Sequence, residues 1–340
     1  MSRITIKDIA RRAGVSTATV SYVINESRYV SPEFKSRVLK AIAELGYYPD
    51  DNARSLRSKK TSTIGLIVPD NSNPFFAEIA KGVEDAGFEA GYSVILCNSN
   101  AMLERERVYL EVLLSKRVEG IILFSTTTGL EQIESIVKRG IPMAIFYRES
   151  GNLDVDTFSL DNFKAGYDAT RHLIELGHTE IACIKPLSPT NPSARRVDGY
   201  KKALEDYGLT WREALTPQGN NLISGGERAA RELLGSGQRF SAIFACNDAM
   251  AIGAMRALRE AGFRIPQDIS IVGFDDIILA TYSNPPLTTI ASPKQEAGRF
   301  AVERLLERIN GIHEGGARNF MLETYLVIRE STAPYHNRKE

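Results

Sequence analysis

The chain has 340 residues, of which 43% are hydrophobic, and its 42 Lys and Arg residues balance its 42 Asp and Glu residues. This length predicts two or three domains with cores of their own and excludes a largely disordered chain. No stretch approaches the roughly 20 apolar residues that cross a bilayer, and the start MSRITIKDIA lacks the apolar segment of a secretory signal. We therefore expect a cytoplasmic protein with no membrane partner.

The balanced charge hides an uneven distribution. Residues 1–60 contain 12 basic and 6 acidic side chains, a net charge of +6, so residues 61–340 carry −6. A small basic segment joined to a larger acidic body is typical of a nucleic-acid-binding module with an appended domain. The cysteines Cys97, Cys183 and Cys246 are odd in number and widely spaced. They predict buried small side chains, with neither a disulfide framework nor a metal site.

Local signals predict three short helices in the first 46 residues. Thr5 can cap a helix over 6–13 that ends at Gly14, and Ser16 can cap a second helix over 17–25. A third helix begins at Pro32, where proline suits the first helical position, and ends at Gly46. The side chains expected to face the core from this third helix are Phe34, Val38, Leu39, Ile42 and Leu45.

A helix, a glycine turn, a second helix and a supporting helix predict a helix-turn-helix domain, whose second helix lies in the major groove of DNA. Thr17, Ala18 and Tyr22 fall on the outward face of that helix and are the predicted base contacts. The remaining DNA-binding candidates here, placed for phosphates or at a helix start, are Thr5, Ser16, Thr19, Ser21 and Asn25. The alternative, a small domain whose polar face is merely solvated, does not explain the local charge of +6.

The stretch that begins ITIKDIARRAGVSTATVSYVIN and runs to Asp70 resembles the start of the lactose/galactose repressor family (LacI/GalR), and the match continues over essentially the whole chain. The resemblance implies a headpiece over 1–48 and a hinge over 49–61, with Ala53, Leu56 and Arg57 at DNA-contacting positions. Leu56 would wedge into the minor groove and bend the duplex. Tyr22 stands where relatives often carry Arg or His, so different operator bases are expected there.

Beyond residue 62, short apolar runs alternate with amphipathic helices, which predicts parallel sheets with helices on both faces. The predicted strands are 64–68, 93–97, 120–124, 143–146, 181–184, 242–245 and 269–273. The predicted helices are 75–90, 103–116, 130–139, 163–176, 195–207, 225–235, 248–261 and 295–310. We expect a periplasmic-binding-protein-like core of two doubly wound lobes, about 62–162 with 293–323 and 163–292 with 324–340.

In such a fold a ligand binds at the carboxyl ends of the strands, between the lobes. Polar and aromatic side chains follow several predicted strands, and together they suit the hydroxyls and ring faces of a sugar. The resemblance implies an effector-binding set of Asn73, Phe75, Phe76, Arg148, Asp161, Asn162, Arg196, Asn247 and Asp275. It leaves Asp161 and Asn162 as alternatives for one contact.

Structural roles compete with ligand binding at several of these positions. Phe75 and Phe76 begin a helix and could pack the lobe instead. Asp248 is expected to cap the helix that follows it while Asn247 faces the cleft. Arg195 and Arg196 are adjacent, so one of them is expected on the surface, and Asp276 is expected to be a structural turn acid. Two positions depart from the family pattern: Ser292 replaces a ligand-facing glutamine, and Tyr147 stands where many relatives have aspartate.

These observations predict a repressor that binds a near-palindromic double-stranded DNA operator as a homodimer and responds to a small-molecule effector, a ribose-like sugar. The alternatives are a purine corepressor in the same cleft, a catabolite-control-type regulator whose signal is a phosphocarrier protein, and a sugar-transport receptor. The sequence contains no G-x-G-x-x-G after a strand, no P-loop and no G-x-S-x-G. It therefore predicts neither an enzyme nor a bound cofactor.

Overall fold

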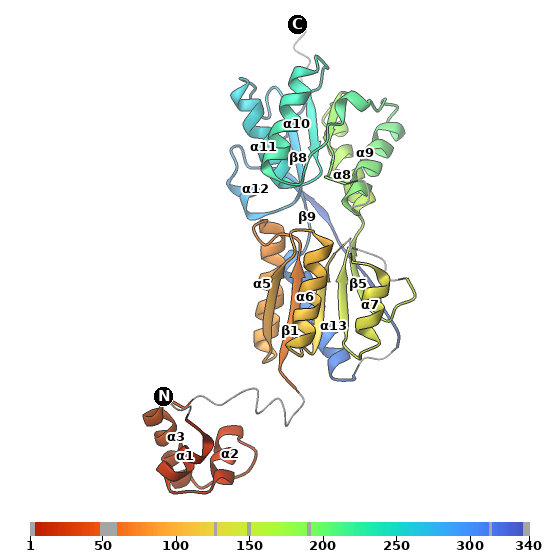
Figure 1. The fold of residues 1–340 in the computed structure, drawn as a ribbon. Coiled ribbons are helices and arrows are strands. Elements are labelled where there is room, and N and C mark those ends of the chain that lie inside the picture. Colours follow the sequence, from red (N-terminus) through yellow and green to blue (C-terminus); the bar gives the residue numbers. More distant parts are fainter. Residues whose placement is uncertain are drawn as a thin grey trace. The chain divides into compact units, whose positions relative to one another are not determined.

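The computed structural model describes residues 4–47, 60–125, 128–147, 151–188, 192–312 and 315–335. The chain divides into two compact units, residues 1–61 and 62–340 (Figure 1).

The first unit is a three-helix domain built from α1 (Ile6–Ala13), α2 (Thr17–Asn25) and α3 (Pro32–Leu45). Both the amide and the hydroxyl of Thr5 donate to Asp8 Oδ2, at 3.0 and 2.7 Å, which fastens the start of α1. Gly14 ends α1 with a φ of 65°, a left-handed conformation that costs glycine little. The predicted helix-turn-helix is confirmed.

The inward stripe predicted for α3 is partly wrong. Val38 and Ala41 are buried, whereas Phe34 and Leu39 are 40% and 50% exposed. Leu39 follows Val38 directly, and one residue rotates the side chain by about 100° around a helix, so both cannot face one small core. Phe34 lies in the first turn of α3, where the Arg37 guanidinium lies 5.6 Å from its ring centroid.

The second unit contains two sheets, as predicted. The first has the strand order β10-β5-β4-β3-β1-β2 and is parallel throughout; the second has the order β11-β9-β8-β7-β6, with only its edge strand β11 antiparallel. The strands of the first sheet are β1 (Thr63–Val68), β2 (Ser93–Asn98), β3 (Gly120–Phe124), β4 (Met143–Phe146), β5 (Asp156–Leu160) and β10 (Asn319–Leu322). Those of the second are β6 (Ile181–Ile184), β7 (Ala242–Ala245), β8 (Ser270–Asp275), β9 (Thr288–Ala291) and β11 (Tyr325–Val327).

Helices cover both faces of each sheet (Figure 1). In the first lobe, α5 (Pro74–Glu89) and α13 (Lys294–Ile309) pack on one face, and α6 (Leu103–Ser115) and α7 (Leu130–Val137) pack on the other. The second lobe carries α8 (Asn162–Glu175), α9 (Arg195–Asp206), α10 (Ile223–Gly235), α11 (Asp248–Glu260) and the short α12 (Ile278–Tyr282). Two 3₁₀ turns, Pro192–Ala194 and Glu213–Leu215, lie in its loops.

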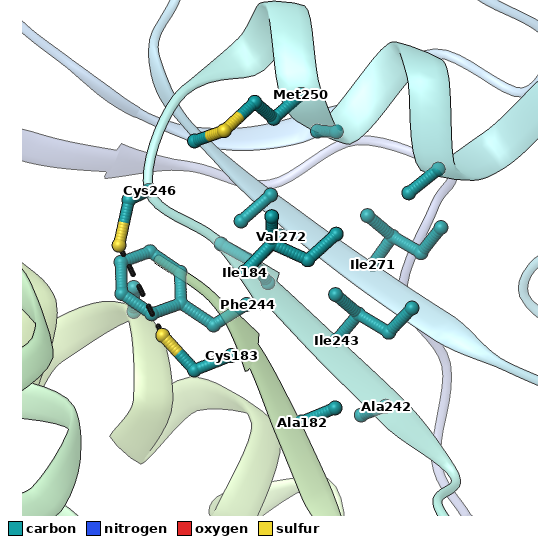
Figure 2. Close-up of a cluster of buried hydrophobic side chains, with 14 of the residues drawn as sticks. Ala182, Cys183, Ile184, Ala242, Ile243, Phe244, Cys246, Met250, Ile271 and Val272 are labelled. Carbon is teal, nitrogen blue, oxygen red and sulfur yellow. Dashed lines mark hydrogen bonds between the residues drawn. The ribbon is translucent and has the colours of Figure 1, made fainter. Parts of the chain in front are cut away.

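The second lobe has an apolar core in which Cys183 of β6 and Cys246, just after β7, place their sulfur atoms 3.9 Å apart (Figure 2). All three cysteines are free and buried, as the sequence predicts. Burial raises the pKa of the Cys183 thiol well above its usual value, so it stays protonated. Among the residues described, no helix is both long and apolar enough to span a bilayer.

Candidate functional site

The first candidate site is the outward surface of α2. Ser16 caps this helix by accepting the Thr19 amide at 3.0 Å, and Thr17 and Ala18 are exposed beside it. Tyr22 is half-buried and lies under the Arg28 guanidinium, 5.3 Å from its ring centroid. The N-terminal turn of α2 therefore presents small side chains and free helix amides outward, next to a cation.

The other DNA-binding candidates in this unit lie on or near the same helix. Asn25 is exposed, but its amide nitrogen donates back to the Ser21 carbonyl at 2.8 Å and to the Ser21 hydroxyl at 3.2 Å. Thr5 is exposed at the start of α1. The hinge candidates Ala53, Leu56 and Arg57 lie outside the described residues.

The second candidate site is a cavity of about 620 Å³ between the two lobes. The strands of each sheet point their carboxyl ends toward it, so the loops that follow them supply its lining. It brings together seven of the predicted effector-binding residues: Asn73, Phe75, Phe76, Asn162, Arg196, Asn247 and Asp275.

Aromatic rings form the wall of this cavity that belongs to the first lobe. Phe75 and Phe76 meet edge to face at 5.0 Å, and Phe76 meets Phe124 in the same way at 5.9 Å. Tyr147, which has a φ of 62°, lies 6.1 Å from Phe75 and also lines the cavity. Phe75 is 6% exposed and belongs to the lobe core as well, so the packing and lining roles coincide.

A buried ion pair lines the part of the cavity that belongs to the second lobe. Arg196 is 7% exposed and its Nη1 lies 3.6 Å from Asp275 Oδ1. Its Nε donates to Asn162 Oδ1 at 2.8 Å, its Nη1 donates to the Cys246 carbonyl at 2.5 Å, and the guanidinium stacks 3.4 Å from the Phe274 ring centroid. These contacts hold a planar cation in one orientation beside the cavity.

Burial controls the protonation of the acids here. It raises the pKa of Asp275 from its ordinary value to about 6, against the opposing effects of Arg196 and Lys294. Burial, together with the charge of Asp275, also raises the pKa of the Tyr147 hydroxyl, which stays protonated. Asp275 therefore offers the cavity a carboxylate acceptor above about pH 6, beside the guanidinium, amide and phenol donors that line it.

The capping role predicted for Asp248 is wrong, whereas Asn247 lies at the cavity as predicted. Asn247 caps α11, since its Oδ1 accepts the Met250 amide at 2.9 Å, and it lines the cavity at the same time. Asp248 points into the core, where it accepts the Thr289 hydroxyl at 2.6 Å and the Ile277 amide at 2.8 Å. Burial, followed by the charge of Asp275, raises the pKa of Asp248 well above its ordinary value.

Asp161 is a second correction, because it does not line the cavity. It is exposed and caps α8 by accepting the Lys164 amide at 2.9 Å, while the next residue, Asn162, is buried against Arg196. The predicted effector contact Arg148 lies outside the described residues.

Burial and pairing decide the roles of three further residues near the cavity, Arg195, Asp276 and Ser292. Arg196 is buried whereas the Arg195 side chain is 66% exposed, so Arg195 is the surface member of the pair, as expected for adjacent helical residues. Asp276 pairs with Arg329 at 2.7 Å, in keeping with a structural role. Ser292 is buried and is not among the residues that line the cavity.

The sequence did not predict several of the lining residues. Asn220 and Asn221 come from a loop in the second lobe that follows an isolated bridge between Lys185 and Gln218 and not a predicted strand. The Asn221 carbonyl accepts the Asn247 side-chain amide at 2.9 Å. Glu106 and Ser125 line the first lobe, where Ser125 Oγ donates to Glu106 Oε2 at 2.5 Å. The asparagine pair in the sequence was the only signal that could have found that loop.

Comparison with known proteins identifies the family to which the two units belong. Residues 5–50 match the family model for bacterial regulatory proteins of the lacI family, and residues 61–330 match that for periplasmic binding proteins and the sugar binding domain of the LacI family. The chain belongs to the LacI family. It is a DNA-binding transcriptional repressor with a ligand-controlled core, and the expected fold class is confirmed.

Relatives and solved structures match most or nearly all of this chain. The chain is 43% identical to the ribose operon repressor of Escherichia coli (strain K12), over 90% of this chain and 93% of that protein. It is 40% identical to the HTH-type transcriptional repressor PurR of Vibrio vulnificus (strain CMCP6), over 96% and 98%. A lac repressor dimer bound to operator and the anti-inducer ONPF matches with a TM-score of 0.86 at 28% identity, over 98% of this chain and all of that one. A LacI family transcriptional regulator from Enterococcus faecium with bound ribose matches with a TM-score of 0.73 at 34% identity, over 81% and 100%.

Proposed function

We propose that this repressor reads its operator through α2 of a headpiece over 1–48, completes the contact through a hinge over 49–61, and is controlled by a ribose-class sugar in the cavity of 62–340. Thr17, Ala18 and Tyr22 contact bases, and Leu56, flanked by Ala53 and Arg57, is the minor-groove wedge. Thr5, Ser16, Thr19, Ser21 and Asn25 contact phosphates. The exposed N-terminal turn of α2, within a segment of net charge +6, carries the DNA half of this proposal.

The proposal that the effector is a sugar rests on the aromatic rings and the buried ion pair that line the cavity. A sugar places its apolar ring face on aromatic side chains and its hydroxyls on charged and amide groups. Phe75 and Phe76 supply the rings, and Asp275 and Arg196 supply a paired acceptor and donor. The names of two relatives, a ribose operon repressor and a regulator with bound ribose, support the choice of ribose.

Exposed apolar side chains support a homodimer. They occur on β2 and α6 of the first lobe and on α12 of the second. They are Leu96, Val108, Val112, Ile278, Leu279 and Tyr282. Apolar groups gathered on a soluble protein's surface are typical of an interaction face, and a two-fold dimer places two headpieces on the half-sites of a palindromic operator.

The test is operator binding by the purified full chain, with and without D-ribose. We expect D-ribose to raise the melting temperature and to change operator affinity by at least five-fold, because an effector must favour one of two states. The sign of that change assigns ribose as inducer or corepressor. Hypoxanthine is the second ligand, and a response to it in place of ribose would assign a purine corepressor.

Two substitutions locate the site. Asp275→Asn removes the carboxylate that is paired with Arg196 and should abolish the response to D-ribose while leaving operator binding intact. Asp198→Asn is the matched control, because Asp198 lies on the exposed side of α9 and is not among the lining residues. A normal ribose response in Asp275→Asn would show that the cavity is not the effector site.

A further inference from the structure

The segment 275–278 belongs to the second lobe but is fastened to the first. It connects the end of β8 to the start of α12. Within it, Ile277 is 2% exposed and its side chain packs in the apolar core of the first lobe, with Phe75 and Ile79 of α5 and Ala297 of α13. An apolar anchor of one lobe is thus inserted into the other, directly after the cavity residue Asp275.

Lys294, the first residue of α13, holds the backbone of the same segment. Its side chain is 6% exposed, and its Nζ donates to the carbonyls of Asp275 at 2.6 Å and Asp276 at 2.7 Å. Those two residues have φ angles of 110° and 53°, a region that side chains other than glycine rarely adopt. A buried ammonium that binds both carbonyls stabilises this strained turn from across the lobe boundary.

Glu78 of α5 completes the contact. Its Oε2 lies 3.7 Å from Lys294 Nζ, and its Oε1 accepts the Ile278 amide at 3.3 Å. On the other side, Asp248 of the second lobe accepts the Ile277 amide. Backbone groups of segment 275–278 are therefore hydrogen-bonded to side chains of both lobes.

We infer that Lys294 and Glu78, with segment 275–278, form an interlobe clamp that transmits the occupancy of the cavity to the angle between the lobes. A ligand shifts a conformational equilibrium only through contacts that differ between the two states. Asp275 can contact the ligand through its carboxylate while its carbonyl is held by the other lobe. A ligand that hydrogen-bonds to this carboxylate therefore acts on a backbone segment that the first lobe holds in place. This inference rests on the proposed function, because it takes the cavity as the effector site.

The same geometry gives the clamp an electrostatic signature. The charged groups that face Asp275 are Arg196 of α9, Lys294 of α13, Glu78 of α5 and Asp248 of α11. Lys294 lowers the pKa of the Asp275 carboxyl, which is about 6 with the cation present. Removing the cation should raise it, so sugar binding that needs the ionised carboxylate should require a higher pH.

The test compares Lys294→Met and Glu78→Gln with the unaltered full chain and with two reference variants. Lys294→Arg keeps the cation and should retain most of the slow amide exchange and of the response to D-ribose that Lys294→Met is expected to lose. Glu89→Gln breaks a different ion pair between α5 and α13, that of Glu89 with Arg299 at 2.5 Å, which lies within the first lobe. It is the matched control for general loosening of these two helices.

Three measurements are made. The first is hydrogen exchange of the amides in 276–279 without ligand, which we expect to quicken at least ten-fold in Lys294→Met and not in Glu89→Gln. The second is the ratio of operator affinities with saturating D-ribose and without it. We expect that ratio to fall to within two-fold of unity in Lys294→Met, with ligand-free operator affinity kept within three-fold. The third is the pH midpoint of ribose binding, which we expect to rise in Lys294→Met.

The outcomes separate the clamp from the proposed function. If D-ribose does not bind the unaltered chain, the proposed effector is wrong, and unchanged exchange in Lys294→Met would then refute the clamp independently. If ribose binds and regulates, an unaltered affinity ratio in Lys294→Met at saturating ribose overturns the inference. Equal loss of the ratio in Glu89→Gln would also overturn it, because the effect would then be general loosening of the lobe.

Discussion

Asp275 shows how a buried acid in the lining of the cavity costs stability. Asp275 is 6% exposed, and the pKa of its carboxyl is raised from 3.8 to about 6 in the folded chain. The folded state therefore binds a proton more tightly than the unfolded state does, so stability decreases as pH rises from about 4 to about 6 and stays reduced above. At about 1.36 kcal/mol per pH unit, the ionised carboxylate costs about 3 kcal/mol at neutral pH.

Replacing Asp275 should recover the stability that its ionised carboxylate costs. Asp275→Asn should raise the free energy of unfolding at pH 8 by up to about 3 kcal/mol, because the amide never ionises, and the gain should shrink as the pH approaches 4. Denaturant unfolding at pH 8 and pH 4.5 measures it. Asp206→Asn, on the exposed surface of α9, is the control. An equal gain at both pH values would show that the carboxyl is not the titrating group.

Adjacent residues in the sequence show why local rules did not settle every role. Asn247 and Asp248 are equally good helix caps. Asp248 enters the core because Thr289 and the Ile277 amide, 41 and 29 residues away, offer buried donors there. Asp161 and Asn162 separate in the same way, since Arg196 takes Asn162 as a partner and leaves Asp161 to cap α8. Such partners are invisible to a window of a few residues.

The close pairing of α5 with α13 depends on a glycine. A Cβ built on Gly82 would lie 2.1 Å from the backbone oxygen of Gln295, closer than any real contact. Because that obstacle is backbone, a larger residue must push the two helices apart. The same helices carry Glu78 and Lys294, so their spacing also controls the interlobe clamp.

We therefore predict that Gly82→Ala destabilises the chain by about 1–3 kcal/mol, although alanine is the better helix former. Gly235→Ala is the control, because it is the last residue of α10 and nothing lies within 4 Å of its added Cβ. It should be neutral or slightly stabilising. Thermal or denaturant melts of the two variants decide the matter, and a stabilised Gly82→Ala would mean that the two helices do not approach as closely as this spacing requires.

Strands with a continuous apolar run could be predicted, and short or polar strands could not. The seven strands predicted from apolar runs all form, with ends within two residues. β1, β3, β4, β7 and β8 are buried almost throughout, and the edge strands β2 and β6 still carry an apolar run. β10 and β11 were missed because they are short edge strands that are half exposed. β9 was missed because it is buried but begins with two polar threonines. β5 was missed because its first residue is an acid, Asp156, which is buried as the partner of Arg308 at 2.8 Å.

At the scale of the whole molecule, the two signs of charge belong to different units. The basic residues concentrate in 1–60, and the excess of acids lies in 61–340. Phosphate binding releases counterions from DNA, so the affinity of a basic segment for an operator falls steeply with salt. An acidic core reduces nonspecific attraction to DNA by the larger unit.

Operator affinity of the full chain should accordingly drop by about 10³-fold between 50 and 200 mM KCl, as for a protein that makes six or more phosphate contacts. Lys7→Gln in the first unit should make the dependence shallower, whereas Arg256→Gln on α11 should not change it. Fluorescence anisotropy with labelled operator measures both slopes. A loss of less than ten-fold would contradict phosphate binding by the basic segment.

The sequence alone determined the two-unit organisation, the helix-turn-helix, the alternating strands and helices, and seven of the residues that line the cavity. These follow from periodicity, caps and the position of side chains after buried strands, which are local properties of the chain. Tertiary structure decided which of two neighbouring polar residues faces the cavity, brought in the loop of Asn220 and Asn221, and set Lys294 and Glu78 against segment 275–278. These contacts join residues up to 200 positions apart, and buried polar groups choose whichever distant partner the packing places within reach.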